Sequence, residues 1–202
     1  MRWRGTGDLG GQAVPRPVVV LVAVVALVYA ADVISKLIVV ATLTENTPVP
    51  VLGSLLRLDY LRNPGAAFSL GADGYTVVFT LIAAAVIIAI LRMAHTLASR
   101  RWAVAFGLLL GGALGNLSDR IARSPGPLRG WVVDFIQVPH WPVFNLADSA
   151  ICCGGALMVL LTVLGVRPDG QVDPDRGAGE IPGGETGAGE GCGGGTGAEA
   201  IR

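Results

Sequence analysis

Four long apolar stretches constrain this chain more than any other feature of its sequence. A helix needs about 20 mostly apolar residues to cross the hydrocarbon core of a bilayer. The stretches lie at residues 18–43, 75–91, 102–117 and about 145–166. The second and third are short alone, but their flanks can extend them. The sequence therefore predicts an all-α integral membrane protein with four transmembrane helices.

The composition agrees with a membrane protein. Hydrophobic residues make up 52% of the 202 residues and charged residues only 15%, which is too apolar for an ordinary soluble domain of this length. The net charge is zero, so bulk electrostatics indicates no nucleic-acid partner. The three cysteines show no spacing typical of a disulfide framework or a zinc site; they are Cys152, Cys153 and Cys192.

The arginines predict the orientation of these helices. Loops rich in positive charge stay on the cytoplasmic side of a membrane. Arginines precede the first stretch and surround the connection between the second and third, at Arg2, Arg4, Arg16, Arg92, Arg100 and Arg101. Four crossings then place both termini in the cytoplasm, and loops 44–74 and 118–142 face outward.

We expect three segments along the chain. Residues 1–17 form a cytoplasmic N-terminus, and residues 18–166 form a four-helix membrane domain with a small extracytoplasmic β-like loop region. Residues 167–202 are rich in glycine and contain almost no large apolar side chains. Such a segment cannot bury a core, so we expect a disordered cytoplasmic tail without a catalytic role.

Two of the predicted helices carry ionisable residues, which are costly inside a membrane. Asp32 and Lys36, the only lysine of the chain, lie four residues apart and can pair on one face of the first helix. Asn116, Asp119 and Arg120 share a face at the outer end of the third stretch. A structural interpretation is an ion pair that pins neighbouring helices, together with a polar collar at the membrane surface. The functional interpretation is a set of groups that support a site or donate to a substrate.

The first outer loop contains a second polar motif. Asn63 precedes Pro64, which favours an extended backbone, and Gly65 permits close approach of another backbone. Such a segment can lie beside an extended peptide and hydrogen-bond to it. A turn next to a strand has the same pattern.

Two aspartates precede the last apolar stretch. Asn145 is a good N-cap, and an acid three residues later complements the helix dipole, so capping is one explanation for Asp148. Capping does not explain Asp134, which lies in the apolar segment VVDFI. Two carboxylates brought together have separated pKa values, so one can keep a proton while the other accepts one from water. That arrangement suits direct attack of water on an amide.

Other chemistries compete with the aspartate pair. His140 is a rival general base, although it lies in VPHWP, a pattern typical of an interfacial aromatic belt. His95, on the predicted cytoplasmic side, is a weaker one. A small proton-coupled transporter would also place ionisable residues in the membrane, but it favours carboxylates near the midplane and internal repeats. The sequence contains no evident repeat.

Five blocks, taken in order, resemble the lipoprotein signal peptidase family, also called signal peptidase II, which consists of bacterial membrane aspartyl proteases. The blocks are DVISK at 32–36, NPGAAF at 63–68, GGALGNLSDR at 111–120, VVDF at 132–135 and FNLAD at 144–148. The resemblance spans residues 18–166. The linker between the third and fourth blocks is longer than in many members.

The resemblance implies an aspartic endopeptidase of the bacterial inner (cytoplasmic) membrane with its active site at the extracytoplasmic face. It would cleave diacylglyceryl-modified prolipoproteins before the modified cysteine, with the acyl chains held in membrane lipid and with no metal or cofactor. The catalytic pair of the family falls on Asp134 and Asp148. Its supporting residues fall on Asp32, Lys36, Asn63, Gly65, Asn116, Asp119, Arg120 and Asn145.

Overall fold

The computed structural model of the chain describes residues 15–65 and 74–171. Several sequence-based expectations lie outside these described residues. They concern the first 14 residues with Arg2 and Arg4, positions 66–68 of the NPGAAF block, and the tail beyond residue 171 with Cys192.

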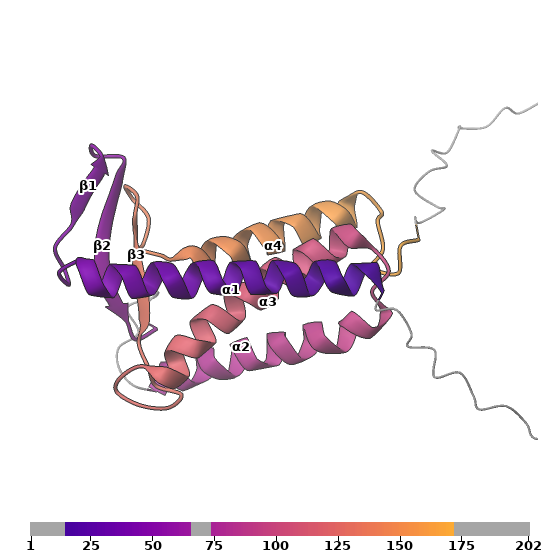
Figure 1. Cartoon of the computed structure of the whole chain (residues 1–202), viewed down its shortest axis with the longest axis horizontal. Helices are drawn as coiled ribbons and strands as arrows, with labels where there is room; N and C mark the ends of the chain where they lie inside the picture. The colour runs from indigo at the N-terminus through magenta and orange to yellow at the C-terminus, as the bar shows by residue number, and fades with distance from the viewer. Residues whose placement is uncertain (1–14, 66–73, 172–202) are drawn as a thin grey trace, which may run out of the picture.

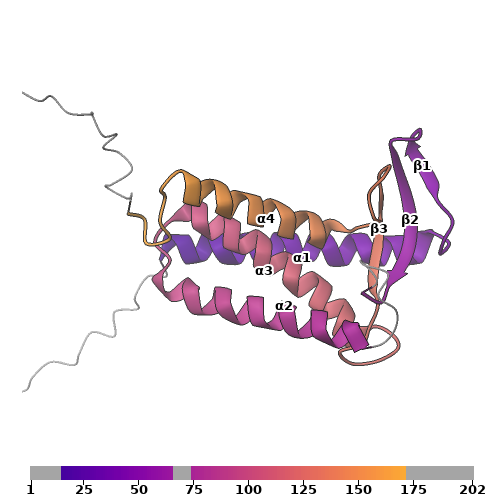
Figure 2. The same ribbon diagram turned by 180° about the vertical axis from the view of Figure 1, so that it is seen from behind.

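Four long helices dominate the described chain (Figure 1). Their bounds are α1 Arg16–Thr42, α2 Gly74–Met93, α3 Arg100–Ala122 and α4 Leu146–Val163, with a short 3-10 helix η1 at Ala94–Thr96 between α2 and α3. Helix α3 lies between the others and packs against α1, α2 and α4. The same arrangement is seen from behind in Figure 2. Helix α3 therefore holds the other three helices together.

Glycines allow α3 to approach its neighbours closely. A Cβ added at Gly107 would lie 2.7 Å from Val24 Cβ, and one at Gly111 would lie 2.8 Å from Val28 Cβ. Gly115 continues this row along the face that packs on α1. Small residues four apart permit such contacts between helices in lipid. The spacing of these glycines therefore gives α3 a face on which α1 packs closely.

Three helices of the described chain are long and apolar enough to cross a membrane. They cover Arg16–Thr42, Thr76–Thr96 and Leu146–Val163, and each carries large apolar side chains exposed on its surface. Helix α3 does not meet this criterion, so the predicted fourth span is not confirmed. The physical reason is that α3 carries two arginines at its start and a polar outer end, and many of its residues are buried by the other helices.

A three-stranded antiparallel sheet lies at one end of the helices (Figure 1). Its strands are β1 Val49–Leu52, β2 Leu56–Asn63 and β3 Val132–Gln137, in that order across the sheet. The sheet corresponds to the predicted β-like loop region. In the β2–β3 register, Leu61 pairs with Asp134 and Asn63 with Val132, which brings the first outer loop beside the candidate aspartate.

The sheet is fastened to the helices by its own small core. Tyr60, Val133 and Phe135 are buried together with Val39 from the end of α1. Burial of apolar side chains of this size stabilises the attachment by roughly 1.5–3 kcal/mol each. The strand that carries Asp134 is therefore held against the helix that carries the ionisable pair.

Both ends of the described chain leave the bundle opposite the sheet (Figure 1). The carbonyl oxygen of Pro168 accepts hydrogen bonds from the backbone N–H groups of Ala98 and Ser99, both at 3.0 Å. Residues 167–171 are thus held to the connection before α3. The predicted tail from residue 167 onward therefore begins with residues that bond to the rest of the chain, and its remainder beyond residue 171 lies outside the described residues.

Candidate active site

Asp134 and Asp148 are brought together by one bridging residue, Asn145. Asp134 lies within β3 and Asp148 in the first turn of α4. The Asn145 side-chain amide donates to Asp134 Oδ1 at 2.6 Å, and its backbone N–H donates to Asp148 Oδ2 at 3.2 Å. In return, Asn145 Oδ1 accepts from the Asp148 N–H at 3.0 Å. The predicted capping role is confirmed, and it leaves Asp148 Oδ1 free of the cap.

Two further amides complete the surroundings of the carboxylates. Asn63 Nδ2 donates to Asp134 Oδ2 at 2.8 Å, and Asn116 Nδ2 donates to Asp148 Oδ1 at 2.7 Å. Each carboxylate therefore accepts from two N–H donors. Hydrogen bonds to a charged carboxylate are shorter and stronger than neutral ones, so they fix both side chains in place.

The two carboxylates have different environments. Asp134 is only 2% exposed, whereas Asp148 is half-buried. Burial raises the pKa of Asp134 to about 6, and the nearby Asp148 raises it too, while hydrogen bonds from Asn63 and Asn145 and the charge of Lys36 act in the opposite direction. A pair of carboxyl groups in unequal environments can divide the roles of acid and base.

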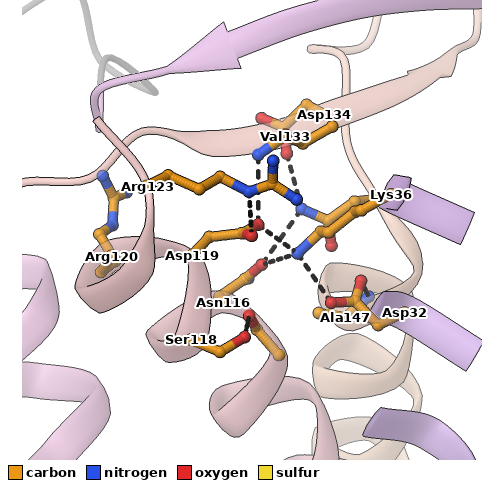
Figure 3. Close-up of polar contacts among 12 residues, drawn as sticks. Asp32, Lys36, Asn116, Ser118, Asp119, Arg120, Arg123, Val133, Asp134 and Ala147 are labelled. Atoms are coloured by element: carbon orange, nitrogen blue, oxygen red, sulfur yellow. Dashed lines mark hydrogen bonds and ion pairs between the residues drawn. The ribbon is translucent and has the colours of Figure 1, made fainter. Parts of the chain in front are cut away.

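Lys36 lies at the centre of a buried polar cluster with Asp32, Asn116 and Asp119 (Figure 3). Its Nζ lies 2.8 Å from Asp32 Oδ2, 2.9 Å from Asp119 Oδ2 and 3.0 Å from Asn116 Oδ1. Asp32 Oδ1 in turn accepts from the Ala147 N–H at 3.0 Å. The predicted pairing of Asp32 with Lys36 is confirmed, and the cluster ties α1 to α3 and to the start of α4.

Asp119 and Arg120 point to different sides of α3 (Figure 3), so the prediction that Asn116, Asp119 and Arg120 share one face is wrong for these two adjacent residues. Asp119 contacts Lys36 and Arg123 and also accepts from the Val133 N–H at 3.3 Å. Arg120 Nη1 donates to Gly130 O at 3.2 Å and to Asn63 O at 3.4 Å.

A cavity of about 310 Å³ opens beside the aspartate pair. At its polar end lie Asp134, Asp148, Asn63, Asn116 and Arg120. Its other walls are apolar and come from α2, α3 and α4, including Ile82, Val86, Leu109 and Ile151. A ligand in this cavity would combine a polar group at the carboxylates with apolar surface between the helices.

The rival residues lie elsewhere. His140 is exposed and borders a separate cavity of about 690 Å³ with Arg57 and Gln137. His95 is in η1, at the other end of the helices. Among the described residues that line the aspartate cavity, neither histidine occurs. Within residues 15–65 and 74–171, no group of three or more His, Cys, Asp or Glu side chains is placed to hold a metal ion.

Sequence reasoning missed contacts that the fold makes around the site. Arg123 binds Asp119, and it could have been found by the same four-residue spacing that linked Asp32 to Lys36. Thr80 Oγ1 donates to Leu128 O at 3.1 Å. This contact joins α2 to the linker after α3, and no local spacing in the sequence indicates it.

The comparisons with known proteins agree with this arrangement. The family profile described as signal peptidase (SPase) II matches residues 24–164. A lipoprotein signal peptidase of Streptomyces coelicolor is 54% identical over 160 residues, which cover 79% of this chain and 78% of that protein. One of Mycobacterium tuberculosis (strain H37Rv) is 45% identical over 161 residues, covering 80% and 79%. A solved bacterial membrane enzyme superposes with a TM-score of 0.63 at 29% identity, over 71% of this chain and 92% of that one.

The apolar helices, the polar end of the bundle and these relatives define a membrane-bound protease. The chain belongs to the signal peptidase II family. The alternative of a small proton-coupled transporter is not supported by any of these relatives.

Proposed function

We propose that this protein is an aspartic endopeptidase that removes signal peptides from prolipoproteins, cutting before a diacylglyceryl-modified cysteine. Its family and its closely similar lipoprotein signal peptidases support the substrate class. The single observation that carries the aspartic mechanism is the bridge made by Asn145, which holds Asp134 and Asp148 at the polar end of an otherwise apolar cavity.

In the proposed reaction, one carboxylate removes a proton from water, and the water oxygen attacks the carbonyl carbon before the modified cysteine. The C–N bond then breaks while the other carboxyl group gives its proton to the leaving nitrogen. The unequal burial of Asp134 and Asp148 supports such a division of roles. After cleavage, the carboxylate that acted as base carries the proton taken from water, and the carboxyl group that acted as acid is ionised. Transfer of one proton between the two restores the starting state.

Substrate positioning follows from the shape of the cavity. Apolar walls from α2, α3 and α4 suit the acyl chains and the apolar signal peptide. Anchoring of the substrate in the membrane would confine its scissile bond to the level of the carboxylates. Holding reactants in place in this way can supply a large part of a rate enhancement. Asn63, Gly65 and Arg120 line this cavity, which supports a role for them in contacting the extended substrate backbone.

The other polar residues of the site hold the catalytic carboxylates and their strands and helices in place. Lys36 and Asp32 hold Asn116 and the start of α4, and Asp119 holds β3 through the Val133 N–H. Asn116 and Asn145 then orient the carboxylates directly. Because these groups are buried and mutually bonded, removing one leaves an unsatisfied partner that costs about 1–3 kcal/mol.

We further propose a location in the cytoplasmic membrane with the sheet and the aspartate pair at the extracytoplasmic face. Residues 1–17 and the tail would lie in the cytoplasm, and residues 18–166 would form the membrane domain. Helix α3 would be the fourth crossing, shielded from lipid by its three neighbours. The buried character of α3 and the arginines around the α2–α3 connection support this arrangement.

The test is cleavage of a diacylglyceryl-modified precursor by purified Asp134→Asn and Asp148→Asn protein. Loss of a general acid or base typically lowers the rate by about 100- to 10,000-fold, and the double variant should be scarcely slower than either single one. Asp59→Asn is the matched control, since Asp59 is a buried aspartate of β2 that is not among the described residues lining the cavity. It should retain parental turnover.

Melting temperatures separate chemistry from folding in this experiment. An Asp134→Asn or Asp148→Asn protein that melts like the parent and still cleaves at the parental rate would exclude that residue from the chemistry. Asp148→Asn is the sharper of the two, because Asp148 also caps α4. A fully active variant would reduce it to a cap.

A further inference from the structure

Asp119 is a junction that connects the two catalytic candidates. One route runs from Asp119 Oδ2 to Lys36 Nζ at 2.9 Å, from Lys36 to Asn116 Oδ1 at 3.0 Å, and from Asn116 Nδ2 to Asp148 Oδ1 at 2.7 Å. The other route is shorter. The same Asp119 oxygen accepts from the Val133 N–H at 3.3 Å, and Val133 directly precedes Asp134.

Arg123 holds the other oxygen of this junction. Its Nε donates to Asp119 Oδ1 in a close ion pair (Figure 3). Arg123 is the first residue after α3, where its own N–H also caps the helix by donating to Asp119 O at 3.0 Å. Its side chain is only 28% exposed, so solvent screens the pair less than it would an open surface pair.

Counted over direct ion pairs, the charges of the cluster balance only when Arg123 is included, while Arg120 acts on Asp119 through its charge at longer range. Asp32 and Asp119 are two carboxylates that share Lys36 as a common cation. Arg123 supplies the second positive charge. Without Arg123, the buried carboxylates of Asp32 and Asp119 would have only Lys36 as a paired cation. Buried charges are costly unless they are paired. Asp119 Oδ1 would then lose the cation that fixes the orientation of this carboxylate.

We propose that Arg123 is a positioning residue for the cleavage reaction, which anchors Asp119 and through it both Asp134 and Asp148. Arg123 touches neither aspartate directly and is not among the described residues lining the aspartate cavity. The residue that begins the linker after α3 thus contributes the charge that fixes Asp119. This inference rests on the proposed aspartic mechanism.

The test compares three variants of the full chain, Arg123→Gln, Arg123→Lys and Arg129→Gln, on a diacylglyceryl-modified precursor peptide. Arg123→Gln should lower kcat about 10- to 100-fold, the size expected when a remote change misplaces reacting groups, with KM within about threefold of the parent. Arg123→Lys should restore kcat to within about threefold, because the charge beside Asp119 is kept. Arg129→Gln is the matched control, since it removes the same charge from an exposed position in the same linker and should change kcat less than about twofold.

Several outcomes would overturn the proposal. They are a parental kcat in Arg123→Gln, a rise in KM alone, and an Arg123→Lys protein as slow as Arg123→Gln at a parental melting temperature. If Arg123→Gln does not accumulate as folded protein, the test rests on Arg123→Lys. A folded Arg123→Lys protein whose kcat is more than about threefold below that of the parent would then overturn the proposal. Failure of the aspartic mechanism can be told apart from failure of this proposal. It would appear as an active Asp134→Asn or Asp148→Asn protein, independently of the result for the Arg123 variants.

Discussion

At the residue scale, the side-chain amides of Asn63 and Asn145 have fixed orientations, and these require hydrogen-bond acceptors at position 134. Asn63 Oδ1 accepts from the Gly65 N–H, and Asn145 Oδ1 accepts from the Asp148 N–H. Each amide must therefore turn its NH₂ group toward Asp134. Only a side chain with two acceptor oxygens satisfies both. Burial opposes the charge that these donors favour, which leaves Asp134 able to change protonation near neutral pH.

This balance predicts how stability depends on pH. The pKa of Asp134 is about 6 in the folded protein instead of 3.8, so between these values the folded protein binds more protons than the unfolded chain. Stability is then greatest below the ordinary pKa and falls as pH rises through about 6. The difference corresponds to roughly 3 kcal/mol at most.

The measurement is the melting temperature of the parent and of Asp134→Asn between about pH 4 and pH 7. The parent should lose stability relative to the variant as pH rises, although the amide at position 134 shifts the variant by a constant amount. A parent that gains stability relative to the variant over this range would contradict the raised pKa.

The contacts of single residues were predictable when they were local. The pairing of Asp32 with Lys36 and the cap made by Asn145 and Asp148 follow from spacings of four and three residues. Asn63 to Asp134 spans 71 positions, and Lys36 to Asn116 spans 80. Such contacts depend on how strands pair and helices cross, so only the resemblance to a family brought these residues to one site.

At the element scale, α3 extends beyond the apolar stretch that predicted it. The stretch ended at residue 117, whereas the helix runs to Ala122. Asp119 lies in this last part and Asn116 just before it, and their side chains bond to Asp148, Lys36 and the β3 backbone. Hydropathy falls where the polar residues begin, but the helix continues because the fold supplies partners for them.

The position of Gly115 gives a prediction about this helix. A Cβ at Gly115 would collide with the Asp32 carboxylate and lie 3.3 Å from Ala147 Cβ. We expect Gly115→Ala to displace Asp32, and with it Lys36, so that kcat falls by about 10-fold or more. Cleavage of the modified precursor and the melting temperature would be measured together.

Gly155→Ala is the matched control for Gly115→Ala. Gly155 lies within α4, and an added Cβ there meets nothing within 4 Å. Alanine favours a helix over glycine by up to about 1 kcal/mol, so this variant should be as active as the parent and no less stable. Equal behaviour of the two variants would show that the close contact at Gly115 is not needed.

At the scale of the whole molecule, α1 and α3 run in the same direction. Moving along α3, Gly107, Gly111 and Gly115 meet successively later residues of α1, from Val24 to Asp32. Helix α3 has 23 residues, about 35 Å at 1.5 Å per residue, which exceeds the roughly 30 Å of a hydrocarbon core. If α1 crosses the membrane, α3 is long enough and correctly directed to cross beside it, although its composition alone does not identify it as a span.

Reporter fusions after Gly53, Ala98 and Gly126 test this topology. Gly53 lies in the β1–β2 turn and Gly126 in the linker after α3, whereas Ala98 lies between η1 and α3. The arginines near Ala98 favour the cytoplasm, so we expect Ala98 inside, and Gly53 and Gly126 outside. Alkaline phosphatase, active outside, and a fluorescent protein that matures inside would report opposite sides. Gly126 on the same side as Ala98 would mean that α3 does not cross the membrane. Strand β3 and Asp134, which follow Gly126 in the chain, could not then lie at the outer face with Gly53.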